Sequence, residues 1–215
     1  MLTISSGGKL KELAEKNKIS HVLIPSGLPP RFSLGYQLGA IIKVLSNSRL
    51  ISFSFNQQLN INPLKWQKLG QKIAFSLKEK VPVIYSSFAN FPLALVWKIK
   101  FNENTKIPAF CNYFPELNHN EMVGFSRFNE KFFLIFLMDK NDRKEIKKRM
   151  NLTAKILKKK NLKSIFIEML EINPLEKIFN NILLADWVSY YLAQNYKVDP
   201  GPVKMVEEFK KLLKN

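Results

Sequence analysis

The segment Phe132–Met138 constrains the fold most strongly, because it places seven apolar residues in a row. A strand with one face in water would alternate apolar and polar residues, and this segment does not alternate. It is also much shorter than the roughly 20 residues that a membrane-spanning helix needs. We therefore predict a strand that is buried on both faces, as in a parallel sheet covered by helices on each side.

Segments with strand and helix signals alternate along the rest of the chain, which favours an α/β fold. Strands are expected at residues 3–8, where a strand end runs into a turn, and at 21–25, 81–85, 107–113 and 164–170. Helices are expected at residues 9–17, 32–45, 66–77 and 93–99, after Asp142, from Pro174, and up to about Leu213. Two of these helices have N-terminal signals. Asp142 with Glu145 resembles a capping box, and Asn173 precedes a proline in the first turn.

The chain is strongly basic, with a formal net charge of +17 and a pI near 9.9. Such a charge is compatible with a nucleic-acid partner. However, the basic residues are spread over the whole chain, and even the densest cluster, residues 140–163, contains acidic side chains. No zinc finger, Arg-rich arm or alternation of basic and aromatic residues occurs. We favour lysines on solvated helix faces and no nucleic-acid partner, and a basic nucleic-acid-binding protein remains the alternative.

Cysteine and histidine are scarce, which limits the chemistry that the chain can support. Cys111 is the only cysteine, so an internal disulfide and a Cys-based zinc site are excluded. His21 and His119 are far apart in the sequence, which argues against a His-rich metal site. The sequence shows neither a signal peptide nor an apolar stretch long enough to span a membrane. We expect a cytoplasmic protein without a metal site and without a membrane partner.

Residues 102–125 are the best candidate for catalytic chemistry, because this segment gathers carboxylates and an imidazole. Glu103, Glu116, His119 and Glu121 stand there among several asparagines. A glutamate can accept a proton and a histidine can relay one, which is the minimum that general acid–base catalysis requires. The spacing alone leaves a second interpretation open, namely a polar loop whose histidine is merely hydrogen-bonded.

Longer motifs in this region resemble those of a known family. Asn-Glu-Asn-Thr-Lys from residue 102 and Pro-Glu-Leu-Asn-His-Asn-Glu-Met-Val-Gly from residue 115 resemble the signature of the bifunctional phosphoglucose/phosphomannose isomerases, in the sugar isomerase (SIS) superfamily. Three further blocks resemble the family in the right order: Ser5–Leu10, Gly27–Tyr36, and Tyr191–Ala193 with Asp199-Pro200. The resemblance covers essentially the whole chain.

This resemblance implies a fold, a reaction and an assembly. The fold would be α/β, with two SIS-type doubly wound halves built on parallel sheets. The reaction would interconvert glucose 6-phosphate or mannose 6-phosphate with fructose 6-phosphate through a cis-enediol(ate), without a metal or an organic cofactor. The family's active sites are shared between two subunits, so a homodimer is implied.

The resemblance also implies roles for single residues. Glu103 resembles the base that moves a proton between C2 and C1, a task that suits a carboxylate. His119 resembles the histidine that helps to open the sugar ring and is supplied by the neighbouring subunit. Lys210 is the best match to the ring-opening lysine. Arg31 resembles the arginine that stabilises negative charge on the enediolate oxygen.

Ser6, Gly7 and Gly8 resemble a loop that the family places near the sugar, and we expect them to bind substrate. Plainer interpretations remain open for several of these residues. Arg31 would then be a solvated loop residue, Lys210 a surface lysine, and the Gly-Gly pair only a turn. A SIS-type module that binds sugar phosphates without catalysis is the corresponding alternative for the whole chain.

The chain departs from the family in one respect that affects function. Family members begin well before the position that matches Met1, and their additional part includes a Ser/Thr-rich phosphate-binding loop. Val96 also stands where a basic residue is expected. We therefore expect residues 1–55 to be the remnant of a first SIS half, 56–80 a helical connector, and 81–215 a complete second half with C-terminal helices. On this interpretation the chain alone has little activity, and its N-terminal half is either a separate polypeptide or lost to a wrong start codon.

Overall fold

The computed structural model describes residues 1–53, 58–127 and 131–213. The chain forms two compact units, Met1–Leu59 and Asn60–Asn215, and each is described by itself. The predicted alternation of strands and helices is present in both units, and all strand pairs are parallel. The prediction of an α/β fold with parallel sheets is thereby confirmed.

Unit 1 is a small β–α–β arrangement. It comprises β1 (Leu2–Ser5), α1 (Gly8–Lys16), β2 (Ser20–Leu23), the short 3-10 turn η1 (Pro30–Phe32) and α2 (Leu34–Asn47). β1 and β2 pair in parallel, with Thr3 beside His21 and Ile4 beside Val22. Helix α1 is the crossover between them, and it buries Ala14.

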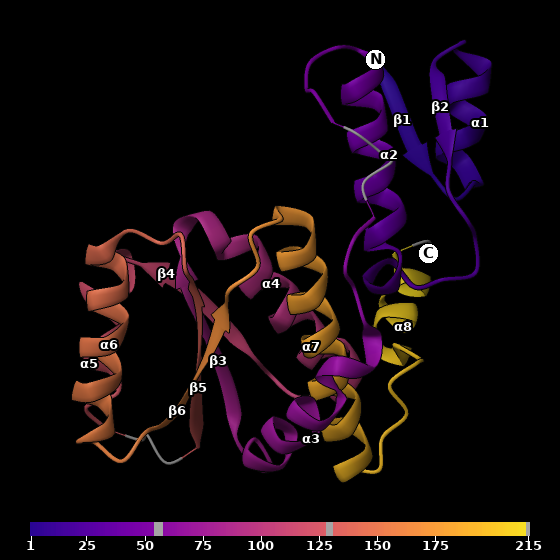
Figure 1. The fold of residues 1–215 in the computed structure, drawn as a ribbon. Coiled ribbons are helices and arrows are strands. Elements are labelled where there is room, and N and C mark those ends of the chain that lie inside the picture. Colours follow the sequence, from indigo (N-terminus) through magenta and orange to yellow (C-terminus); the bar gives the residue numbers. More distant parts are fainter. Residues whose placement is uncertain (54–57, 128–130, 214–215) are drawn as a thin grey trace. The chain divides into compact units, whose positions relative to one another are not determined.

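Unit 2 is a four-stranded parallel sheet with helices on both faces (Figure 1). The strands are β3 (Val81–Ser87), β4 (Phe110–Phe114), β5 (Phe132–Asp139) and β6 (Lys163–Met169), in the spatial order β4-β3-β5-β6. The helices are α3 (Gln67–Ser76), α4 (Phe91–Lys100), α5 (Glu121–Gly124), α6 (Lys144–Lys158), α7 (Pro174–Asn195) and α8 (Lys204–Leu212). The short turns are η2 (Pro63–Trp66), η3 (Phe88–Asn90), η4 (Phe101–Thr105) and η5 (Glu116–Asn118). Helices α3, α4 and α7 cover one face of the sheet, and α5 and α6 cover the other.

Strand β5 explains the apolar run in the sequence. Ile135 and Leu137 point into the core beneath α3, α4 and α7. Leu134 and Phe136 point into the second core, on the side of α6. All four side chains are completely buried. Because successive side chains of a strand face opposite sides, a strand between two cores must be apolar at every position.

Two helix starts test the predicted capping signals, and only one is confirmed. Asn173 caps α7, since its side-chain oxygen accepts a hydrogen bond from the N–H of Leu175 at 2.9 Å. The capping box predicted for Asp142 and Glu145 is wrong. Helix α6 is preceded by Arg143, which makes no side-chain cap. The Asp142 carboxylate accepts from the N–H of Asp139 at 2.9 Å instead.

Helices α3 and α7 approach each other closely at Gly70. A Cβ atom at this position would lie only 2.5 Å from the Cβ of Trp187. Ile73 and Ala74 of α3 are buried in the same core as Leu184 and Val188 of α7. Residues 67–76 are therefore an integral part of unit 2. Within the described part of the chain, no helix is both long enough and apolar enough to cross a membrane.

Candidate active site

Glu103 lies on a π-helical turn, η4, which continues helix α4. Single π-helical turns are rare and occur frequently at functional sites. Helix α7 holds this turn through polar contacts. The Asn104 amide donates to Ser189 Oγ at 2.9 Å, with both residues buried, and Lys100, which is 1% exposed, forms an ion pair with Asp186. The backbone around the half-buried Glu103 is thus held by two polar contacts with one helix.

The chain leaves this turn through Lys106, whose backbone has a left-handed φ of 59°. A non-glycine residue in that region has a steric cost, and contacts with the surrounding structure must offset it. The Lys106 ammonium donates to the carbonyl oxygen of Glu103 and to that of Pro202 at 2.7 Å. Asn102 Nδ2 donates to the carbonyl oxygen of Ile107 at 2.9 Å. The polar residues that flank Glu103 in the sequence motif therefore hold the backbone on which Glu103 stands.

Glu103 lines a pocket of about 620 Å³ within unit 2. Lys106 and Lys204 also line this pocket. The other lining residues come from the end of η4 and from the segment that leads into α8: Asn102, Ile107, Pro108, Val198, Asp199, Pro202, Val203, Met205 and Val206. The pocket is mostly apolar, and its lining includes two carboxylates, Glu103 and Asp199, as well as the two lysine ammonium groups. A small polar ligand that carries negative charge could bind there through the lysines.

His119 and Glu103 lie at opposite ends of strand β4. Because β3 and β4 are parallel, the α4–η4 connection must return to the end of the sheet where β4 begins, and Glu103 is therefore near that end. His119 follows the other end of β4, beyond η5, and its side chain is exposed. The five residues of β4 alone span about 13 Å at the usual rise of a strand. One chain therefore does not bring these two residues into one site.

The predicted substrate-binding residues Ser6, Gly7 and Gly8 lie in unit 1, between β1 and α1. Gly7 and Gly8 have φ values of 131° and 66°, which glycine adopts without the steric cost that other residues bear. Ser6 lines a pocket of about 310 Å³, with Ser33 and Gln37 among its polar neighbours. Gly8 opens α1, so unpaired N–H groups of a helix N-terminus follow directly.

Arg31 and Lys210 have different surroundings. Arg31 is only 5% exposed, and its guanidinium lies 4.7 Å from the centre of the Phe32 ring. The interpretation of Arg31 as a solvated loop residue is therefore wrong. Lys210 is exposed on α8 and forms a 2.8 Å ion pair with Glu207. Among the described residues, the lining of the Glu103 pocket does not include Lys210, and its catalytic role stays a prediction.

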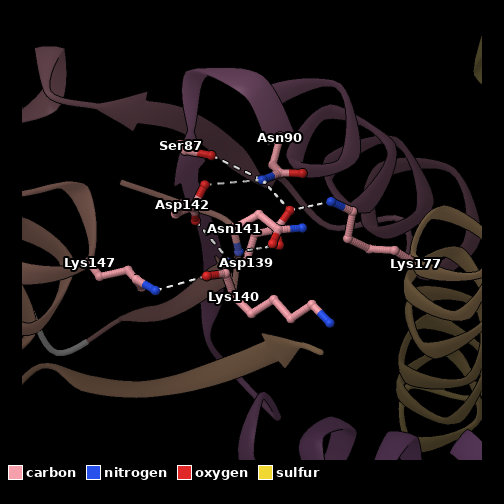
Figure 2. A network of polar contacts seen from close by, with 8 residues as sticks. All are labelled: Ser87, Asn90, Asp139, Lys140, Asn141, Asp142, Lys147 and Lys177. Atoms are coloured by element: carbon pink, nitrogen blue, oxygen red, sulfur yellow. Dashed lines mark hydrogen bonds and ion pairs between the residues drawn. The ribbon is translucent and has the colours of Figure 1, made fainter. Parts of the chain in front are cut away.

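A polar network that sequence reasoning did not assign occupies the edge of the sheet where the strands end (Figure 2). The connections from β3 and β5 lead to opposite sides of the sheet, and open α/β sheets commonly bind ligands at such a point. Here the Asn90 amide donates to Ser87 Oγ at 3.0 Å and to carboxylate oxygens of Asp139 and Asp142 at 3.3 Å. Lys177 of α7 forms an ion pair with Asp139.

Within this network, the buried carboxylate of Asp139 is paired with a cation and accepts several hydrogen bonds. Burial alone would raise the pKa of Asp139, which is 3% exposed. The hydrogen bonds from Lys177, from the N–H of Asn141 and from Asn90 instead lower the pKa of Asp139 below its usual value. Figure 2 shows these donors converging on the carboxylate. In the sequence, this network was indicated only by polar residues that directly follow two predicted strands. That position did not reveal which side chains would form hydrogen bonds with one another.

The described residues contain no group of three or more His, Cys, Asp or Glu side chains that could hold a metal ion. The pKa of the Cys111 thiol is raised, and burial is the largest cause of this shift.

Comparison with known proteins identifies the family. Residues 67–213 match the family described as "Bacterial phospho-glucose isomerase C-terminal SIS domain". The bifunctional phosphoglucose/phosphomannose isomerase of Aquifex aeolicus is 36% identical over 217 residues, which cover 99% of this chain and 67% of that protein. The enzyme of the same name from Caldicellulosiruptor bescii is 34% identical over 237 residues, covering 99% of this chain and 68% of that protein. The chain spans about two thirds of the length of these curated relatives.

A solved structure supports the fold. A hypothetical protein from Thermus thermophilus superimposes with a TM-score of 0.71 and 13% identity, covering 99% of this chain and 61% of that one. This likeness concerns the fold alone, and it agrees with the parallel α/β architecture of both units. The family match and the curated relatives show that this chain belongs to the bacterial phosphoglucose isomerase family and contains its C-terminal SIS domain.

Proposed function

We propose that this protein is an aldose–ketose isomerase that interconverts glucose 6-phosphate or mannose 6-phosphate with fructose 6-phosphate. Membership of the family and the names of its curated relatives support this reaction. The observation that carries the proposal is the position of Glu103. Glu103 lines a pocket of suitable size whose lining also includes two lysines, and it lies on a turn whose backbone is held by α7 and by Lys106. A base that must serve two neighbouring carbons needs such fixed support.

In the proposed reaction, Glu103 acts as the base for both proton transfers. It removes the proton from C2 of the open-chain aldose while the C1 carbonyl oxygen gains a proton, which gives the cis-enediol(ate). The same carboxylic acid then returns the proton to C1, and the C2 hydroxyl loses its proton to become the ketone. The substrate's own carbonyl acidifies the C2 proton, so this chemistry requires neither a metal nor an organic cofactor.

We further propose that the active site is shared between two subunits of a homodimer. His119, which would help to open the sugar ring, lies beyond the other end of strand β4 from Glu103 of the same chain. An exposed histidine at that end is available to the pocket of a second copy, whereas it is out of reach of its own. Two-fold symmetry would then give two identical composite sites.

The remaining residues are assigned by the family resemblance. Ser6, Gly7 and Gly8 would contact the sugar, with backbone N–H groups that follow the glycines. Arg31 would stabilise the charge on the enediolate oxygen, a task in which a buried, fixed guanidinium needs little reorganisation. Lys210 would assist ring opening. The proposal places the protein in the cytoplasm, where hexose phosphates pass between glycolysis and gluconeogenesis.

Replacing Glu103 with glutamine tests the proposal directly. Glu103→Gln keeps the shape of the side chain but removes the base, so turnover is expected to fall by about 100- to 10,000-fold while substrate binding persists. The measurement is exchange of the C2 proton of glucose 6-phosphate in D2O, followed by NMR, with the part of the Aquifex aeolicus enzyme that this chain does not cover added as a second polypeptide. Glu145→Gln, at an exposed glutamate outside this segment, is the matched control and should exchange like the unchanged protein.

Exchange at the unchanged rate in Glu103→Gln would refute the assignment of the base. Binding of glucose 6-phosphate by the unchanged protein, with no exchange at C2, would instead favour the alternative of a SIS-type module that binds sugar phosphates without catalysis.

A further inference from the structure

His119 stands on a short connection between two one-turn elements, η5 and α5. Its side chain is exposed, and its own backbone makes one hydrogen bond, from its N–H to the carbonyl oxygen of Glu116 at 3.0 Å. An exposed side chain on such a short connecting segment is normally mobile. A histidine that must act in the site of another subunit cannot be mobile, because misplacement by about 1 Å can cost 100-fold in rate.

Glu121, two residues after His119, ties this connection to the sheet. Tyr85 OH donates to Glu121 Oε1 at 2.6 Å, and Asn112 Nδ2 donates to Glu121 Oε2. Both oxygens of the carboxylate are therefore engaged. The donors come from neighbouring strands, since Tyr85 lies on β3 and pairs in register with Asn112 on β4.

The Tyr85 anchor is rigid and stays protonated. Its side chain is completely buried, and its ring packs edge-on against Phe114 and Phe136. Burial raises the pKa of the Tyr85 phenol far above its usual value, and the hydrogen bond to Glu121 raises it further. The phenol is therefore a hydrogen-bond donor throughout the working range of pH.

Asn118 holds the same connection from the other side. Its Nδ2 donates to Thr153 Oγ1 at 2.9 Å, and Thr153 is a buried residue of α6. Arg149 Nη1 donates to Asn118 Oδ1 at 3.4 Å. His119 thus stands between an anchor to α6 immediately before it and an anchor to the sheet two residues after it.

We propose that Glu121 is a positioning residue for His119: through its hydrogen bonds to Tyr85 and Asn112, it holds the exposed imidazole in place for the active site of a second copy of this chain. The inference rests on the proposed function, because it deepens the shared site. It assigns the carboxylate of the Asn-His-Asn-Glu motif to positioning, with no direct contact with substrate.

The first test measures order without relying on turnover. His21 and His119 are the only histidines, so the side-chain ¹³Cε1–¹H NMR spectrum of the chain contains two signals. Glu121→Ala should lower the order parameter of the His119 signal. The His21 signal should not change, because His21 is in unit 1 and is held by Thr3 Oγ1 at 2.7 Å. Tyr85→Phe, which keeps the ring and one of the two anchors, should give a smaller decrease. A His119 signal that is as ordered in both variants as in the unchanged chain would overturn the inference.

The second test asks in which subunit Glu121 acts, and it is made with the same added polypeptide from the Aquifex aeolicus enzyme. Glu121→Ala alone should lower turnover by about 10- to 100-fold. Mixed with inactive Glu103→Gln subunits, it should recover activity, because one site of each heterodimer then combines an intact Glu103 with an intact His119. Mixed with inactive His119→Ala subunits, it should show no recovery, because both variants damage the same contribution. Glu145→Ala, at an exposed glutamate of α6, is the matched control and should not lower turnover.

The outcomes of the second test separate the two proposals. Absence of recovery when Glu103→Gln is mixed with His119→Ala, with heterodimers shown to form, would refute the shared site itself. Recovery in that mixture, together with recovery when Glu121→Ala is mixed with His119→Ala, would refute only the role of Glu121.

Discussion

Replacing Gly70 with alanine is expected to destabilise unit 2 by about 1–2 kcal/mol. The new Cβ would lie 2.5 Å from the Cβ of Trp187, and 3.1 Å and 3.2 Å from backbone atoms of Trp187 and Val188. A Cβ atom and two backbone atoms of a packed helix cannot move aside by a change of rotamer. Helices α3 and α7 would therefore have to separate, and the buried contacts beside Gly70 would weaken.

The magnitude is the difference between two opposing effects. Overpacking a well-packed core costs about 1–3 kcal/mol, and the upper part of that range applies here because backbone must move. Alanine in a helix interior is otherwise favoured over glycine by roughly 0.5–1 kcal/mol. For a protein of this size, each kcal/mol lowers the melting temperature by about 2–4 °C, so a decrease of about 2–8 °C is expected.

Urea denaturation followed by tryptophan fluorescence is the suitable assay. All three tryptophans, Trp66, Trp97 and Trp187, lie in unit 2, so the signal reports this unit alone. Gly124→Ala is the matched control, because a Cβ there would meet no atom within 4 Å, and it should change stability little. A midpoint for Gly70→Ala equal to or above that of the unchanged protein, at the same m value, would refute the reasoning.

Two further predictions concern buried charges. Asp186→Ala removes the ion pair with the Lys100 ammonium, which is 1% exposed, and should cost about 3 kcal/mol in urea denaturation; a cost below about 0.5 kcal/mol would contradict this. Lys177→Met removes the strongest hydrogen bond that lowers the pKa of Asp139. Since the folded pKa of Asp139 lies below the unfolded value of about 3.9, its stabilising contribution is present above that value and is lost as the pH falls through the folded pKa. The stability difference between the unchanged protein and Lys177→Met should therefore be large near neutral pH and shrink below about pH 4; a pH-independent difference would contradict the assignment.

Features that depend on local periodicity and local chemistry were predictable from the sequence. The unbroken apolar run at Phe132–Met138 indicated a doubly buried strand, and β5 is that strand. Asn173 before a proline indicated the start of α7, because capping involves only neighbouring residues. The motif around Glu103 also identified the family, since its residue types serve one local turn.

Features that depend on pairing between distant segments were decided only by the tertiary structure. Asp142 has the spacing of a helix cap, but folding brings Asn90 within 3.3 Å of it, and the carboxylate joins that network instead. Glu121 had no role in the sequence until β3 and β4 placed Tyr85 and Asn112 around it. Sixteen positions separate Glu103 from His119, yet strand β4 runs between them and places these residues at its opposite ends. The physical reason is that a sequence pattern fixes which face of an element is apolar, whereas the packing of elements far apart in the chain determines which polar side chains meet.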